Sequence, residues 1–141
     1  MIKAFDHVAI PIQKVDEMIA FYQALGCGVS DDFGKRLYSI HFGDNKINFH
    51  TPKIWQSGKF SLRGPTAQPG CGDFCFVWGD TEVALHQLLD QLNANIEEGP
   101  VAAGTAAPVF IFATRTITYW SLLFIRISHL SAKPALFTPY V

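Results

Sequence analysis

Two stretches of the chain show the same order of patterns: apolar and polar residues first alternate, and apolar residues then recur at helical spacing. In the first stretch, alternation from Phe5 to Ile10 predicts a strand that Pro11 ends, with His7 pointing to one of its faces. Helical spacing then predicts a helix that Gly26 terminates, so the stretch is expected to form a β-α unit. The apolar positions of this helix are Val15, Met18, Ile19, Phe21, Tyr22 and Leu25.

Strand-like and turn-like residues continue as far as residue 50. Arg36–Phe42 predicts a strand, residues 43–46 a turn, and Lys46–His50 a further strand. The expected order is therefore β-α-β-β, with room for one more strand. The following residues, Thr51–Gly72, are rich in Pro, Gly and Ser, which predicts an irregular connection.

The second stretch repeats the first pattern. Asp73–Trp78 alternates as a strand does, and Asp80 and Thr81 are residues that favour the start of a helix. One β-α unit is therefore used twice, which predicts an α+β protein whose two units line one closed or half-closed β structure. The apolar stripe of the second helix consists of Val83, Leu85, Leu88, Leu89 and Leu92.

Composition narrows the class of protein. The chain has 141 residues, of which 49% are hydrophobic and 16% charged, enough for one compact domain. A formal net charge of -1 gives no electrostatic footprint for nucleic acid, and residues 109–127 contain too many Thr and Arg residues to cross a membrane. The amino terminus does not resemble a signal peptide, and Cys27, Cys71 and Cys75 form no C-x-x-C pair. A cytoplasmic protein with reduced thiols and a small-molecule partner is expected.

Five segments within residues 1–101 carry a family resemblance. They read FDHVAIP at 5–11, FYQALG at 21–26, FGDNKINFH at 42–50, PGCGDFCF at 69–76 and IEEGPV at 96–101. Together they resemble the glyoxalase/bleomycin-resistance/dioxygenase superfamily, also called the vicinal oxygen chelate superfamily, and within it glyoxalase-domain-containing protein 5 and virulence-associated glyoxalase-like proteins. The resemblance implies two βαβββ modules that form a cupped, half-closed sheet. It predicts one domain over residues 1–127, with module one at 1–55 and module two at 70–127, while residues 128–141 are expected to be an irregular tail.

The resemblance also implies a divalent metal ion, of the kind Zn, Ni, Mn or Fe, held by strands of both modules. His7 matches the ligand position of the first strand, and His50 matches that of the fourth strand. Asp73 stands where many family members have histidine. Imidazole and carboxylate groups suit a metal centre that keeps positions open for a bidentate substrate. Pairing of the chain as a homodimer is also expected from the family and from the open edges of half-closed sheets.

The chain departs from the family pattern after about residue 101. Every acidic residue lies at or before Glu98, and the family's V-Y-F-R-D-P-D-x-N-L-L-E segment, whose glutamate is the last metal ligand, is missing. Codons permitted by residues 109–122 can spell that segment in another reading frame, with the glutamate across Trp120 and Ser121. A frameshift near residue 101 is therefore one hypothesis, and natural divergence is the other. Without the glutamate, metal binding is expected to be weak or absent.

Two classes of function remain open, together with an inactive relative of either. The first is a divalent-metal-dependent lyase, isomerase or dioxygenase that acts on a small molecule with vicinal oxygens. The second is a metal-free protein of the bleomycin-resistance type that binds a small molecule in an aromatic-lined groove. Other candidate residues have plainer interpretations: His41 and His86 are expected to be solvated, and Cys75 is expected to be buried. The aromatic residues Trp55, Phe60 and Trp78 line either a cavity or the core.

Overall fold

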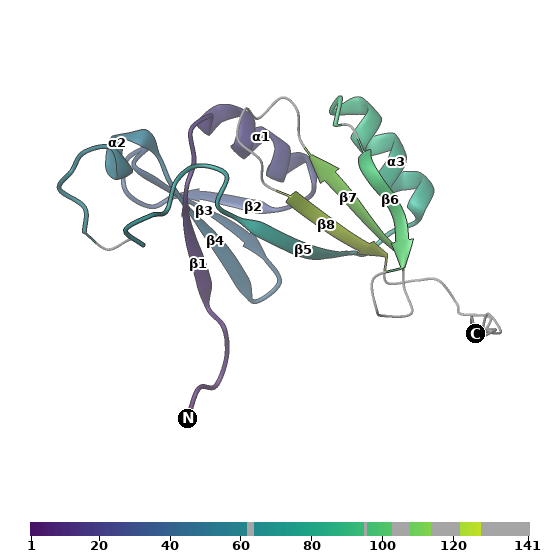
Figure 1. The fold of residues 1–141 in the computed structure, drawn as a ribbon, viewed down its shortest axis with the longest axis horizontal. Helices are drawn as coiled ribbons and strands as arrows, with labels where there is room; N and C mark the ends of the chain where they lie inside the picture. The colour runs from purple at the N-terminus through teal and green to yellow at the C-terminus, as the bar shows by residue number, and fades with distance from the viewer. Residues whose placement is uncertain (62–63, 95, 103–107, 114–121, 128–141) are drawn as a thin grey trace.

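The chain forms two modules with the same order of elements (Figure 1). The structure, a computed structural model, describes residues 1–61, 64–94, 96–102, 108–113 and 122–127. Within these residues each module contains one four-stranded sheet and one ten-residue helix. This architecture confirms the predicted α+β class and the two-module organisation.

Module one contains a mixed sheet in the order β1-β4-β3-β2. Its first strand pairs with β4 in parallel, whereas β4–β3 and β3–β2 are antiparallel. Helix α1 connects β1 to β2 and leaves the last three strands as a meander. The elements are β1 at His7–Pro11, α1 at Val15–Ala24, β2 at Gly28–Asp31, β3 at Leu37–Phe42 and β4 at Asn45–His50.

Module two repeats this topology in the order β5-β8-β7-β6. Its first strand again pairs in parallel with its last, and the side chain of Thr81 caps the helix by accepting a hydrogen bond from the Ala84 N–H at 3.2 Å. The altered stretch of sequence still provides two strands, as its high content of Val, Ile, Phe and Thr allows. The elements are β5 at Asp73–Trp78, α3 at Glu82–Gln91, β6 at Ile96–Ala102, β7 at Pro108–Ala113 and β8 at Leu122–Ile127.

The core of module one lies between α1 and one face of its sheet. Met18 and Tyr22 of α1 are buried against apolar strand residues, and the Tyr22 ring meets the Phe49 ring edge to face at 5.3 Å. Burial of these side chains fixes which face of each strand turns toward the helix, because strand residues alternate between faces. The strand residues of this core are Ile10, Ile40, Ile47 and Phe49.

An aromatic seam joins the two modules. Phe74 and Phe76 of β5 pack against the core of module one and also against Leu85 and Leu89 of α3. The Phe76 ring lies 4.9 Å from the Phe42 ring. Gly72 belongs to the same seam, because a Cβ atom there would clash with the Phe74 ring. The two modules therefore share packed side chains.

Several local expectations differ from the structure. The connection Thr51–Gly72 contains a short helix, α2 at Pro52–Trp55, whose first residue is the proline that helix starts favour. The strand β2 comes in addition to the elements that periodicity predicted. Cys75 is exposed, because β5 turns its phenylalanines, and not its cysteine, toward the helices. The expected tail at 128–141 lies outside the described residues, and no described helix is long and apolar enough to cross a membrane.

Candidate functional site

The side chains that carry candidate chemistry in module one lie on the face of its sheet opposite α1, here called the helix-free face. Alternation along β1, β3 and β4 turns the apolar core residues toward α1 and every second residue away from it. Register supports this assignment, since Ser39 lies opposite Asn48 and His7 opposite Lys46. The helix-free face includes His7, Ser39, His41, Lys46, Asn48 and His50.

His7 is held by a neighbouring carboxylate. Its Nδ1 atom lies 3.0 Å from Oδ1 of Asp6, and its side chain is 43% exposed. The hydrogen bond from His7 lowers the pKa of Asp6, so the carboxylate is ionised and accepts a hydrogen bond from the Nδ1–H group. In the neutral ring this pairing leaves Nε2 unprotonated, which is the form in which a histidine ligates a metal ion.

His50 lies at the other end of the same face and is only 4% exposed. The ring of Phe60 meets the His50 ring edge to face at 4.9 Å, so the connection after β4 covers it. Burial lowers the pKa of His50, and the charge of a protonated His7 lowers it further. His50 is therefore a neutral imidazole at physiological pH.

The predicted ligand set is only partly described by the structure. His7 and His50 come from neighbouring parallel strands, four positions apart in register. At ~3.3 Å per strand residue their backbones are separated by ~13 Å along the sheet, so the two rings must lean toward each other to share an ion. The side chain of Asp73 lies outside the described part, and among the described residues no three His, Cys, Asp or Glu groups gather as a metal site. The set His7, His50 and Asp73 stays a prediction.

A polar network that the sequence analysis missed crosses the helix-free face. Asp32 follows β2 and accepts a hydrogen bond from Ser30 Oγ at 2.8 Å and another from the buried Ser39 Oγ. Ser30 Oγ also lies 3.0 Å from His41 Nε2, and Ser39 Oγ lies 2.9 Å from the side-chain amide of Asn48. The two serine hydrogen bonds lower the pKa of Asp32. We call these five residues the Asp32 network; polar residues at alternate positions of β3 and β4 were its only trace in the sequence.

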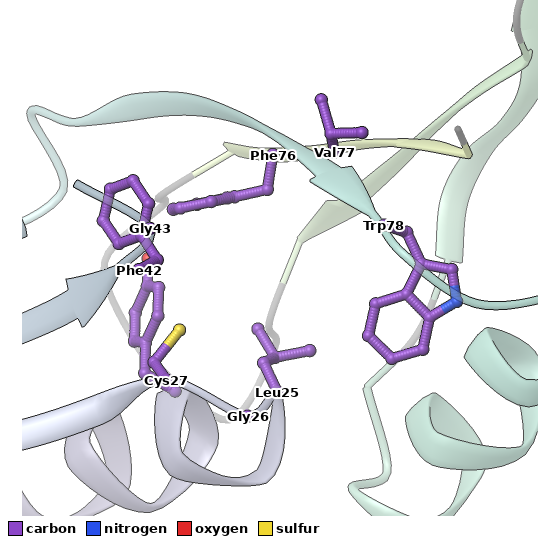
Figure 2. Close-up of a pocket in the computed structure, with 9 residues that line it drawn as sticks. Leu25, Gly26, Cys27, Phe42, Gly43, Phe76, Val77 and Trp78 are labelled. Atoms are coloured by element: carbon purple, nitrogen blue, oxygen red, sulfur yellow. The ribbon is translucent and has the colours of Figure 1, made fainter. Parts of the chain in front are cut away.

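A second candidate site is a cavity of about 230 Å³ between the modules. Figure 2 shows Phe42, Phe76 and Cys27 on one side of the cavity and Trp78 on the other. Burial raises the pKa of the Cys27 thiol, which is therefore protonated and unreactive. Of the three aromatic residues singled out from the sequence, Trp78 lines this cavity, whereas Trp55 donates a hydrogen bond to the Ile12 carbonyl at 2.9 Å and Phe60 covers His50.

Comparisons with known proteins agree with the paired modules. No family model matches the chain. The glyoxalase domain-containing protein RDO1 of Mycosarcoma maydis is 33% identical over 116 residues, which make up 81% of this chain and 62% of that protein. The chain thus spans less than two thirds of the relative's length.

Two solved structures show the same arrangement of modules. A virulence protein of Salmonella typhimurium has a TM-score of 0.72 at 23% identity, over 90% of this chain and 98% of that one. A fosfomycin resistance protein, FosX of Listeria monocytogenes, has a TM-score of 0.61 at 13% identity, over 89% of this chain and 90% of that one; it was solved as a variant with Mn(II) and 1S,2S-dihydroxypropylphosphonic acid. The fold is therefore of the glyoxalase type. Together with the glyoxalase-domain relative, these findings support the resemblance of the chain to the glyoxalase/bleomycin-resistance/dioxygenase (vicinal oxygen chelate) superfamily.

Proposed function

We propose that this protein is a divalent-metal-dependent lyase, isomerase or dioxygenase of the glyoxalase type, acting on a small molecule with vicinal oxygens. The observation that carries the proposal is the Asp6–His7 pair, because a carboxylate that accepts from Nδ1 is the usual support of a metal-ligating histidine. The diol-bearing ligand and Mn(II) in the FosX structure support the same class of chemistry. The activity of the chain as written is weak, because the family's last-strand glutamate is missing.

The residues available fit a metal of the Zn, Ni, Mn or Fe type. His7 and His50 would hold the ion as neutral imidazoles, and Asp73 would add a carboxylate oxygen. A bound ion would polarise the oxygens of the substrate. His7 is kept in the ligating tautomer by Asp6, whereas Phe60 shields His50 from water. Two or three protein groups are fewer than tight sites normally have, so we expect substoichiometric binding.

Metal analysis tests this proposal. The purified protein is loaded with Zn, Ni or Mn, dialysed, and measured by elemental analysis. We expect His7→Ala and His50→Ala to lower the bound metal, and His86→Ala to leave it unchanged, because His86 lies on α3 beside Glu82 and away from the helix-free face. Equal metal content in all four proteins would overturn the proposal.

The cavity between the modules favours a second candidate, a metal-free small-molecule-binding protein of the bleomycin-resistance type. At about 230 Å³ it has room for a small aromatic molecule, and its walls are mainly aromatic and aliphatic. A titration with indole in the presence of EDTA tests this function. Indole should bind the wild-type protein and shift the NMR signal of the Trp78 ring N–H, because Trp78 lines the cavity, whereas Phe42→Ala should weaken binding; an unshifted Trp78 signal at saturating indole would contradict this function.

We also propose a cytoplasmic homodimer. The three cysteines carry free thiols, which fits a reducing compartment. Phe33, 66% exposed, and Val77, 63% exposed, offer apolar surface that a second copy would cover. Sedimentation velocity at high protein concentration tests the assembly, and a species of monomer mass alone would contradict it.

A further inference from the structure

The two serine hydroxyls of the Asp32 network make four hydrogen-bond contacts but carry only two protons, which constrains the direction of each hydrogen bond. Ser30 Oγ contacts Asp32 and His41, and Ser39 Oγ contacts Asp32 and Asn48. Each serine has one hydroxyl proton. Asp32 is ionised and can only accept, so both hydroxyl protons point to its carboxylate.

Because both hydroxyl protons point to Asp32, the direction of the hydrogen bonds that His41 and Asn48 make to the serines is determined as well. His41 must donate from Nε2 to Ser30 Oγ, because that oxygen has no proton left to give. The structure places Oδ1 of Asn48 against Ser39 Oγ, but that hydroxyl proton goes to Asp32, so we reassign the Asn48 amide with Nδ2 donating to Ser39 Oγ; oxygen and nitrogen of a side-chain amide are assigned from the surrounding hydrogen bonds. The atoms that point away from the network are then the Asn48 carbonyl oxygen and, in the neutral ring, His41 Nδ1. Both are hydrogen-bond acceptors.

We propose that Asp32 is a positioning residue that sets the hydrogen-bonding polarity of the helix-free face, so that Asn48 and His41 select small neutral molecules bearing hydroxyl donors. The inference rests on the helix-free face being the ligand site of the proposed function. Lys46 lies on the same face, opposite both His7 and His41 in register, and its positive charge acts on the carboxylates of Asp32 and Asp6. Because charges of both signs lie near this face, the selection is assigned to the two acceptors and not to net charge.

The tautomer of His41 tests the first step without any ligand. Long-range ¹H–¹⁵N NMR of the metal-free protein at pH 8 should show the Nε2–H tautomer. Observation of the Nδ1–H tautomer would overturn the proposal, since Ser30 would then donate to His41 and not to Asp32.

Substitution of Asp32 tests the second step. In Asp32→Asn an NH2 group, which donates, replaces one of the two carboxylate oxygens. The serine that faces this group must turn its hydroxyl proton toward His41 or Asn48, and that residue then loses the acceptor that points away from the network. Binding is measured by NMR titration with propane-1,2-diol and, for comparison, with butane-2,3-dione, which has acceptors only. We expect the wild type to prefer the diol and Asp32→Asn to lose about threefold to tenfold of that preference, the effect of one hydrogen bond.

Two further variants separate this effect from a general loss of charge or fold. Asp44→Asn removes the same charge from the exposed β3–β4 turn and should keep the preference. Ser39→Ala removes the link between Asp32 and Asn48 and leaves the link through Ser30 to His41. It should therefore weaken the preference for the diol while His41 keeps its tautomer. An unchanged preference in both Asp32→Asn and Ser39→Ala would overturn the inference.

The titrations use metal-free protein in EDTA, which keeps the two proposals apart. Loss of metal binding with a retained diol preference would remove the proposed enzymatic function and leave the recognition surface. Metal binding through His7 without a diol preference would leave the proposed enzymatic function and remove the recognition surface.

Discussion

Replacement of Phe76 by alanine should loosen the seam between the modules. The Phe76 ring lies 4.9 Å from the Phe42 ring and 6.1 Å from the Tyr22 ring, both in edge-to-face geometry. It also packs on the core of α3, so it is one of two β5 phenylalanines that contact both cores. Phe76→Ala removes these contacts and enlarges the adjoining cavity.

The size of the effect follows from burial. Truncation of a fully buried phenylalanine to alanine costs about 3 to 5 kcal/mol, and Phe76 is partly buried, so we expect a loss of about 2 to 3 kcal/mol in the free energy of unfolding. Within this loss, each of the two edge-to-face ring pairs contributes about 0.5 to 1.5 kcal/mol. For a chain of this length the midpoint of thermal unfolding should fall by about 5 to 10 °C.

Urea unfolding followed by two tryptophans gives the measurement. Trp55 reports on module one and Trp78 on module two, so Trp55→Phe and Trp78→Phe, each combined with Trp120→Phe, allow each module to be followed separately. The two transitions should coincide in the wild type and separate in Phe76→Ala. Phe5→Ala is the control, since Phe5 is 63% exposed and its loss should cost less than about 0.5 kcal/mol. Equal stability of Phe76→Ala and Phe5→Ala would refute the seam as the coupling element.

Three further predictions follow from the same structure. Because burial lowers the pKa of His50, the unfolded chain binds that proton more tightly, so the free energy of unfolding in EDTA should fall as pH drops below about 6.5; His50→Gln should remove this decline and His86→Gln should keep it. Thr51→Val should cost about 1 kcal/mol in urea unfolding, because the fully buried Thr51 hydroxyl donates to the Arg36 carbonyl at 2.9 Å and one buried hydrogen bond is lost, although that carbonyl still accepts from the Thr51 N–H at 3.0 Å; an unchanged midpoint would contradict this role. The coding DNA should encode the family's glutamate segment in the alternative frame, which sequencing would show. A protein restored to that frame after Val101 should bind more metal than the present chain, and His7→Ala should abolish the gain. Equal metal content by elemental analysis would exclude the glutamate as a ligand.

Periodicity predicted the elements whose burial is one-sided. The β1–α1 unit, β3, β4, β5 and α3 each have an apolar face that alternates or recurs clearly, and the structure contains all of them. Strand β2 has four residues of intermediate to high exposure, and its pairing depends on β3 and not on its own pattern. Helix α2 is a single turn stabilised by its contact with the sheet, where Trp55 donates to the Ile12 carbonyl.

Candidate site residues were predicted less completely than the fold. His7 and His50 stand out because they match the ligand positions that the family resemblance implies, and both lie on the helix-free face. The Asp32 network depends on which residues of three strands lie side by side, and the register that brings Ser39 opposite Asn48 is a property of the folded sheet. Exposure of Cys75 likewise depends on which face of β5 meets α3, a choice that alternation alone leaves open.

The strand order β1-β4-β3-β2 affects how the chain is built during synthesis. Within the described residues, every strand of the first sheet finds its partners between residues 7 and 50. The strand that carries His7 must wait for β4 to leave the ribosome, after which the sheet has all its hydrogen-bonding partners before the last strands of module two emerge. A change of reading frame near residue 101 therefore leaves every strand of that sheet unaltered, and its routes to the helix-free face are the aromatic seam and the glutamate that the family resemblance implies.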